Sequence, residues 1–463
     1  MARRGRPARP PRLAALLAGA MMLGCGSSAH ALGTPAPWSA PAPLSACPAQ
    51  GPVAAVFPSD SPSAATGAGA VVWSATSACP GGEGARVAPI GAGGLPGPGA
   101  LPRSAAGRAL GPDGSLVVSS APHGQIVIAG SAPASSHLGL LVQGAAAGPF
   151  APLALPAGLA TAPLELVRAY LGDVGLVSAA GEGSAATKPR VGVERYFAGS
   201  FTRETPLASG PASSFSLALD YRTDVLVVWA AGGSIYARDI PARGPPHAAQ
   251  RLAACGPHPT IATLLSDNNR AIVAWADDRA GHTSVFLDRS KTGVRFGSAT
   301  LLERFADPPG TAAPAASPRL VRLSSESVMM AWSGAAAGLR VIRTAPIDLR
   351  GLGAVSTIAT PGSDALLADL APGPAGDAVV LWTEPQPGAG GAPDMARQAI
   401  LAARGYDAYP GRAIFGSSEQ VSAPAAVAGA SLAVDPSNDG AIAVWRGQGA
   451  LPEYSIRAGF PPP

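Results

Sequence analysis

The sequence predicts an all-β protein, a β-propeller of about eight four-stranded blades, with seven blades as the alternative. Three observations lead to this fold class. A short apolar segment recurs about every 50 residues along the chain. Charged residues make up only 13% of the 463 residues, too few for a coiled coil or a long helical bundle. The 58 glycines and 49 prolines, 107 of 463 residues or about 23%, stay just under the share at which unpatterned glycine and proline indicate disorder.

The recurring apolar segment is the central element of this repeat. Six of its eight copies end in tryptophan, and the spacing between successive ends varies from 46 to 63 residues. Such a period with short strands is typical of propeller blades. Because the segment is apolar throughout, we expect it to be the second strand of each blade, covered on both faces by its neighbours. The copies occupy residues 70–73, 125–129, 174–178, 225–229, 271–275, 328–332, 378–382 and 441–445.

The other three strands of a blade are predicted from the residues around this segment. An apolar stretch followed by Asp, Asn or Gly precedes it, as in residues 431–440, and favours a first strand that ends in a tight turn. A variable loop and a third strand ending in arginine come after it, as at Arg238 and Arg289. We expect these arginines to be structural features of outer strands. Residues 296–302 and 415–421 are predicted fourth strands.

The last repeat lacks a fourth strand, because the chain stops shortly after Arg457. The segment 38–44, ahead of the first repeat, is similar to the fourth strands. We therefore expect it to pair with the last blade, close the ring and remove an exposed edge. Its prolines suit an outermost strand. We assign residues 32–52 to a linker with this closing strand and residues 53–463 to the propeller, and we expect a monomer.

Residues 1–31 are predicted to be a signal peptide. Five arginines precede the apolar run 13–23, and small residues follow it. The signal peptide predicts an exported protein. Without this segment the chain has 28 basic and 29 acidic residues (33 minus 5 against 29), so its charge is nearly neutral and we expect no nucleic-acid partner. No later segment is apolar enough to be a transmembrane span. Two cleavage sites remain open: one after Ala31, for free secretion, and a lipobox-like one before Cys25, whose acylation would anchor the protein.

One repeat carries a family resemblance. Residues 259–305, with Asp277, Asp278 and Arg279 after the tryptophan and a turn before Phe296, resemble the repeats of secreted bacterial sialidase-like propellers of the Asp-box type. The aspartate of the Asp-box is missing from residues 290–293. The resemblance implies a fold of degenerate propeller repeats and does not transfer an activity.

A ligand site is expected on one face of the propeller. The loops between second and third strands and the links between blades emerge there together. Paired carboxylates could support glycoside hydrolysis, which makes Asp277, Asp278 and Glu384 candidate catalytic residues. Further candidates for ligand contact are Arg279, Arg446 and Glu83.

The sequence favours a binding protein over an enzyme. It contains no nucleophile motif, no metal motif and no cofactor motif, so we expect neither a metal nor a cofactor. The favoured hypothesis is a non-enzymatic propeller that binds an extracellular glycan or protein through its loops. The alternative is a sialidase-like glycoside hydrolase or a polysaccharide lyase that uses the acidic loop residues.

Three unmodified cysteines, Cys47, Cys79 and Cys255, remain after either cleavage, in a compartment where a disulfide would form. Cys47 and Cys255 occupy the same position of the repeat, four repeats apart, and so lie on opposite sides of a ring. Cys79 follows Trp73, the tryptophan of the first repeat, in a loop on the same face as Cys47. We therefore predict a Cys47–Cys79 disulfide and a free Cys255.

Overall fold

The computed structural model describes residues 37–459 except for a number of shorter segments between and within the strands. Residues 1–36, with the predicted signal peptide and Cys25, and residues 460–463 are outside the described part. The segments within the chain that are also outside it are residues 58–68, 92–93, 102–109, 111–115, 122–124, 133–134, 144–149, 154–161, 169–173, 180–190, 198–199, 202–204, 209–211, 221, 223, 267–269, 307–316, 349–350, 359–363, 389–392 and 409–410.

The described residues form eight antiparallel sheets, which we number by the position of their first strand in the chain. The first four sheets contain the following strands. The first has β2 (Ala49–Val56), β3 (Gly69–Ala75) and β4 (Gly84–Ile90); the second has β5 (Leu116–Ala121), β6 (Gln125–Ala132), β7 (Ser135–Gln143) and β8 (Phe150–Leu153); the third has β9 (Ala162–Arg168), β10 (Val174–Ala179), β11 (Val191–Phe197), β12 (Ser200–Phe201) and β13 (Thr205–Ala208); the fourth has β14 (Ser214–Leu219), β15 (Val225–Ala231), β16 (Ser234–Ile240) and β17 (Gln250–Ala254).

The other four sheets follow the same plan. The fifth has β18 (Thr260–Leu265), β19 (Ala271–Arg279), β20 (His282–Ser290) and β21 (Thr300–Ala306); the sixth has β22 (Arg319–Arg322), β23 (Val328–Ala336), β24 (Leu339–Ile347) and β25 (Ser356–Thr357); the seventh has β26 (Leu366–Pro372), β27 (Asp377–Pro387), β28 (Pro393–Ala408), β29 (Arg412–Phe415) and β30 (Glu419–Ala425); the eighth has β31 (Ala428–Val434), β32 (Ala441–Arg446), β33 (Pro452–Arg457) and β1 (Ala42–Pro43).

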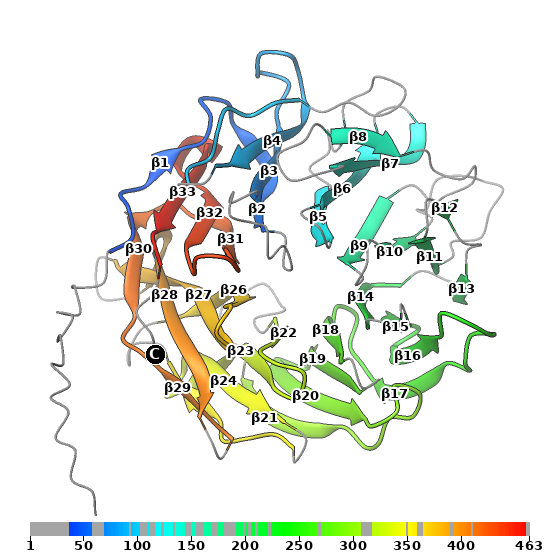
Figure 1. The fold of residues 1–463 in the computed structure, drawn as a ribbon. Coiled ribbons are helices and arrows are strands. Elements are labelled where there is room, and N and C mark those ends of the chain that lie inside the picture. Colours follow the sequence, from blue (N-terminus) through cyan, green and yellow to red (C-terminus); the bar gives the residue numbers. More distant parts are fainter. Residues whose placement is uncertain are drawn as a thin grey trace, which may run out of the picture. The chain divides into compact units, whose positions relative to one another are not determined.

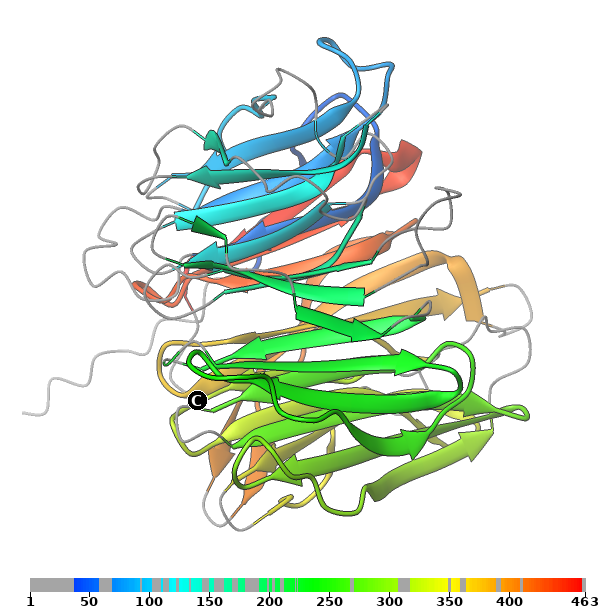
Figure 2. The same ribbon diagram turned by 90° about the vertical axis from the view of Figure 1, so that its right-hand side faces the viewer.

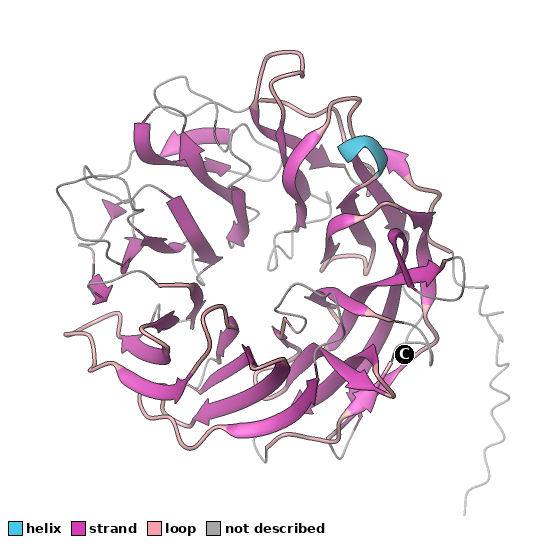
Figure 3. Cartoon of the chain, turned by 180° about the vertical axis from the view of Figure 1, so that it is seen from behind, coloured by secondary structure: helices cyan, strands magenta, loops and turns pink. Residues whose placement is uncertain are grey.

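The sheets follow one another around a centre (Figure 1). The first strand of each sheet contacts the first strand of the next, and β31 of the eighth sheet contacts β2 of the first. In Figure 2 the fourth and fifth sheets, in green, are adjacent layers. A single 3-10 turn, η3 (Gln448–Ala450), is the only helical element in the described part of the chain (Figure 3). The expected all-β propeller is confirmed.

The second strand of the sheets forms the core. Every residue of β3 is buried, and the tryptophans at the ends of the apolar segments are at most 2% exposed, as for Trp73 and Trp229. Each packs against an adjacent sheet: Trp275 of the fifth sheet lies in one cluster with Val228 of the fourth. Burying such a side chain stabilises the fold by roughly 3–5 kcal/mol relative to alanine, so the repeated tryptophans hold the sheets together.

The N-terminal segment closes the ring as predicted. Ala42 of β1 pairs with Tyr454 of β33, and the Ser39 N–H donates to the carbonyl of Ile456 at 2.8 Å. Trp38 is 7% exposed and packs in the core between the seventh and eighth sheets. The next strand, β2, begins at Ala49, inside the segment that the sequence analysis assigned to the linker.

The predicted fourth strands were wrong in their bounds. β21 begins at Thr300 instead of residue 296, because Phe296 is drawn into the core between the fourth and fifth sheets, where the Gln250 side chain bonds to its backbone N–H and C=O, each at 3.0 Å. Residues 415–421 divide between two strands, because the 16-residue β28 pairs with both β29 and β30. The third-strand arginines also vary in position: Arg457 ends β33, but Arg86 is inside β4.

In the part of the chain that the structure describes, no helix has the length and hydrophobicity to span a bilayer.

Candidate binding site on the loop face

The antiparallel order of the strands divides the connections between two ends of the sheets. The loops between second and third strands and the links from one sheet to the next lie at one end, which we call the loop face. The turns between first and second strands and the connections between third and fourth strands lie at the other end, the turn face. The candidate residues Asp277, Glu384 and Glu83 all belong to the loop face.

The Asp277, Asp278 and Arg279 constellation is at the end of β19. Asp277 is 4% exposed; its Oδ1 accepts the N–H of Gly256 in the link from the fourth sheet, and its Oδ2 pairs with Arg279 Nε at 2.7 Å. Asp278 Oδ1 accepts the hydroxyl of Thr283 across the hairpin at 2.5 Å. These carboxylates therefore hold the loop in place.

Glu384 has a similar structural contact. It is 8% exposed, and its Oε1 accepts the indole N–H of Trp382 at 2.8 Å. Glu453 accepts the indole N–H of Trp445 at 2.8 Å, and Glu303 that of Trp332 at 2.9 Å. This role of the glutamates was not predicted from the sequence. Only Glu384 and Glu453 are close enough in sequence to their tryptophans, two and eight residues away, for a local pattern to signal it.

The remaining candidates belong to three different sheets. Glu83 is exposed in the β3–β4 loop, Arg446 is half-buried at the end of β32, and Arg279 has 47% of its side chain exposed. The structure therefore brings Asp277, Asp278 and Arg279 together in one hairpin of the fifth sheet, whereas Glu384, Arg446 and Glu83 belong to the seventh, eighth and first sheets.

A cavity of about 520 Å³ opens on the loop face near the first strands of the first, sixth, seventh and eighth sheets. None of the six candidate residues lines it. Most of its wall is apolar or small, from Pro52–Ala54, Leu366–Ala368 and Val427–Ala430. Its charged groups are the exposed Arg319 at the start of β22 and Asp369 of β26. Asp369 Oδ2 accepts the N–H of Leu432 at 2.9 Å and so links the seventh and eighth sheets.

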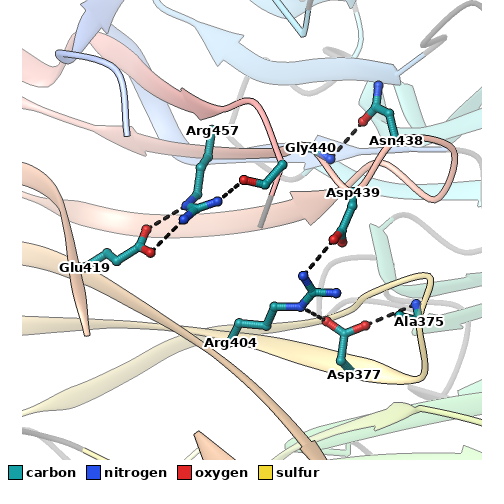
Figure 4. A network of polar contacts seen from close by, with 9 residues as sticks. Ala375, Asp377, Arg404, Glu419, Asn438, Asp439, Gly440 and Arg457 are labelled. Atoms are coloured by element: carbon teal, nitrogen blue, oxygen red, sulfur yellow. Dashed lines mark hydrogen bonds and ion pairs between the residues drawn. The ribbon is translucent and has the colours of Figure 1, made fainter. Parts of the chain in front are cut away.

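The recurring arginines do not gather at this cavity. Figure 4 shows two of them joining the seventh and eighth sheets. Arg404 pairs with Asp377 and, through Nη1, with Asp439 at 2.7 Å, while Arg457 binds both oxygens of Glu419 at 2.6 and 2.7 Å. Burial opposes the charge of Arg404, but the hydrogen bond and charge of Asp377 outweigh it and raise the pKa of Arg404.

Cys47 and Cys79 belong to one core cluster and Cys255 to another. Cys47 packs against the core cluster that contains the buried Cys79, and all three cysteines are free thiols in the structure. Burial and a hydrogen bond with Cys47 raise the pKa of Cys79. Cys255 belongs to a different core cluster, where burial and the charge of Asp277 raise its pKa.

No protein-family model and no curated protein sequence matches this chain. Among solved structures it is similar to an ulvan lyase of a polysaccharide lyase family, with a TM-score of 0.45 and 10% identity over 82% of this chain and 96% of the other. It is also similar to YCF48 bound to D1 peptide, with a TM-score of 0.39 and 11% identity over 75% and 92%.

A third similar structure is a prolyl endopeptidase, with a TM-score of 0.43 and 15% identity over 70% of this chain. This chain spans only 43% of that protein's length. The neighbours are β-propeller-type proteins of different activities, and identities this low concern the fold alone.

Proposed function

We propose that this chain is an exported binding protein that holds a ligand on its loop face without transforming it. The observation that supports this proposal most directly is the use of the acidic loop residues as structural acceptors. A glycosidase needs one carboxyl group as acid and a second as base or nucleophile, about 5–10 Å apart across the scissile bond. Asp277 and Glu384 instead accept hydrogen bonds from Gly256 and Trp382.

The ligand that best fits the loop-face cavity is an extended protein segment. Ten of the fifteen lining residues are apolar or glycine, which suits the side chains of a protein segment better than the hydroxyls of a glycan. The five polar lining residues are Arg319, Asp369, Thr383, Gln398 and Ser431. Arg319 at the rim would pair with an acidic residue of such a segment. Of the two ligand classes expected from the sequence, glycan or protein, this lining favours protein.

Export and the disulfide belong to the same proposal. The arginine-rich start and apolar run of residues 1–31 support secretion, with lipid anchoring at Cys25 as the alternative. In an oxidising compartment, the neighbouring thiols of Cys47 and Cys79 would be oxidised by a disulfide-carrying protein or small molecule. The bond would tie the closing segment to the β3–β4 loop.

The test is a selection of peptides from a random displayed library, followed by affinity measurements on purified variants. We expect Arg319→Glu and Ala368→Phe to weaken binding at least about tenfold, the effect of losing one good contact. Glu83→Gln, an exposed loop-face change outside the cavity, is the matched control and should bind as the unmodified protein does. Unchanged binding by both cavity variants would overturn the proposed site.

A screen with fluorogenic glycosides and polysaccharides tests the enzymatic alternative on the same preparations. We expect no turnover. Turnover that disappears in Glu384→Gln or Asp277→Asn, with the melting temperature preserved, would show that the protein is an enzyme.

A further inference from the structure

A second cavity, of about 450 Å³, lies on the turn face between the fifth and sixth sheets. Its wall comes from the turn before β19, the end of β20 with the segment that follows it, the turn before β23 and the end of β24. Its volume is within the range of about 300–1,000 Å³ that small-molecule sites occupy. It shares no lining residue with the loop-face cavity.

Two buried polar atoms in this wall have no hydrogen-bond partner among the described residues. Asp288, at the end of β20, is 3% exposed; its Oδ1 accepts the N–H of Arg289 at 2.7 Å, and its Oδ2 is the first of these atoms. The second is Nη1 of Arg270, just before β19. A buried polar atom without a partner costs about 1–3 kcal/mol, and folded proteins keep few of them. A polar ligand in this cavity could therefore bond to both the unpartnered acceptor, Asp288 Oδ2, and the unpartnered donor, Arg270 Nη1.

We propose that this cavity binds a neutral mono- or disaccharide. A sugar hydroxyl is both donor and acceptor, so one or two hydroxyls can donate to Asp288 Oδ2 and accept from Arg270 Nη1. The hydroxyls of Ser298 and Thr300 add further polar contacts, and the aliphatic side chains of Ile272 and Val328 can pack against the C–H groups of the ring.

The charge of the wall explains the choice of a neutral ligand. Three cationic side chains, Arg270, Arg289 and Lys291, are matched by three anionic ones, Asp288, Glu326 and Asp348. A uronic acid or a sulfated sugar would therefore gain no net attraction, whereas a neutral sugar uses donors and acceptors equally.

The experiment is saturation-transfer NMR and calorimetry of the mature protein with a panel of neutral mono- and disaccharides. Asp288→Asn replaces the acceptor Oδ2 with a donor while keeping the shape, and we expect affinity to fall at least about tenfold, as when a hydrogen bond to a charged group is lost. Asp239→Asn is the matched control, because Asp239 is 4% exposed on the same face and is outside this cavity. It should leave saccharide binding unchanged.

A second variant tests the cavity independently, in case Asp288→Asn misfolds because its side chain is buried. Ser325 is exposed at the mouth of the cavity, so Ser325→Trp blocks entry without changing the core. We expect it to abolish saccharide binding, whereas Arg319→Glu, on the loop face, should not change it. The proposal is overturned if no neutral saccharide binds, if amino acids or charged sugars bind in their place, or if binding survives both Asp288→Asn and Ser325→Trp. A variant that loses peptide binding but still binds saccharide supports the turn-face site and shows that the two sites are independent.

Discussion

The two faces differ in how their buried carboxylates are paired. On the loop face, Asp364 accepts hydrogen bonds from the backbone N–H and the guanidinium of Arg340. On the turn face, one carboxylate oxygen of Asp288 has no hydrogen-bond partner among the described residues. Burial opposes ionisation at both positions. At Asp364 the hydrogen bonds from Arg340 outweigh it and lower the pKa; at Asp288 burial outweighs the backbone hydrogen bonds and raises the pKa.

The same contrast extends to other carboxylates. On the loop face Asp277 and Glu384 hold a link and a tryptophan in place. On the turn face Asp220 and Asp239 each have one buried oxygen without a partner in the described part of the chain, and burial raises the pKa of both. An acidic residue in a loop therefore need not mark a polar binding site. Among these six carboxylates, the three with a buried oxygen unpartnered by any described residue, Asp288, Asp220 and Asp239, lie on the turn face, where the sequence predicted no site.

The largest expected effect comes from breaking the Arg340–Asp364 pair. Asp364→Ala leaves a buried guanidinium uncompensated and should lower the free energy of unfolding by about 3–5 kcal/mol in urea titrations at pH 7. Because the pKa of Asp364 is lowered in the fold, its contribution is present above the unfolded pKa of about 4 and is lost as the pH falls through the folded value. The double variant Arg340→Met with Asp364→Leu should recover part of the loss; a loss below 1 kcal/mol at pH 7 contradicts the prediction.

The Cys47–Cys79 disulfide should be the next largest contribution. The bond closes a span of 32 residues (79 minus 47), worth about 3–4 kcal/mol in the chain-entropy model. Cys79→Ser should therefore lower the melting temperature of oxidised protein and not of reduced protein, while Cys255→Ser serves as the control in both states. Non-reducing peptide mapping identifies the pair, and a Cys47–Cys255 or Cys79–Cys255 peptide would refute the assignment.

A smaller effect is expected at Glu384. Glu384→Leu removes the acceptor from the buried indole N–H of Trp382 and should lower the free energy of unfolding by about 1–3 kcal/mol. Glu83→Gln, on the exposed surface of the same face, should stay within about 0.5 kcal/mol. Thermal unfolding of the two variants measures the difference, and equal stability would remove the structural role that we assign to Glu384.

The smallest effect, and one of opposite sign, is expected at Asp288. Since burial raises its pKa in the fold, the ionised form destabilises the protein at neutral pH; this penalty shrinks as the pH falls below the folded pKa and is gone below the unfolded pKa of about 4. Asp288→Asn should therefore raise the melting temperature slightly at pH 7 and leave it unchanged near pH 4. A lower melting temperature of the variant at pH 7 would show that the Asp288 carboxylate is paired after all.

Much of the architecture could be predicted from the sequence, because it depends on local patterns. The apolar segment with its terminal tryptophan marks the second strand of a blade wherever it occurs. The closing strand at residues 38–44 follows from the missing fourth strand of the last repeat, and the neighbourhood of Cys47 and Cys79 follows from the repeat register. Each of these inferences needs only the order of strands around a ring.

The tertiary structure alone decided which polar groups are satisfied, because their partners are distant in the chain or lie in another sheet. Asp277 bonds to Gly256, 21 residues earlier, and Glu303 reaches Trp332 in the next sheet. The start of β21 depends on Gln250, 46 residues before Phe296. The turn-face cavity combines segments of two sheets that no sequence pattern connects, so its paired donor and acceptor become visible only when the sheets pack side by side.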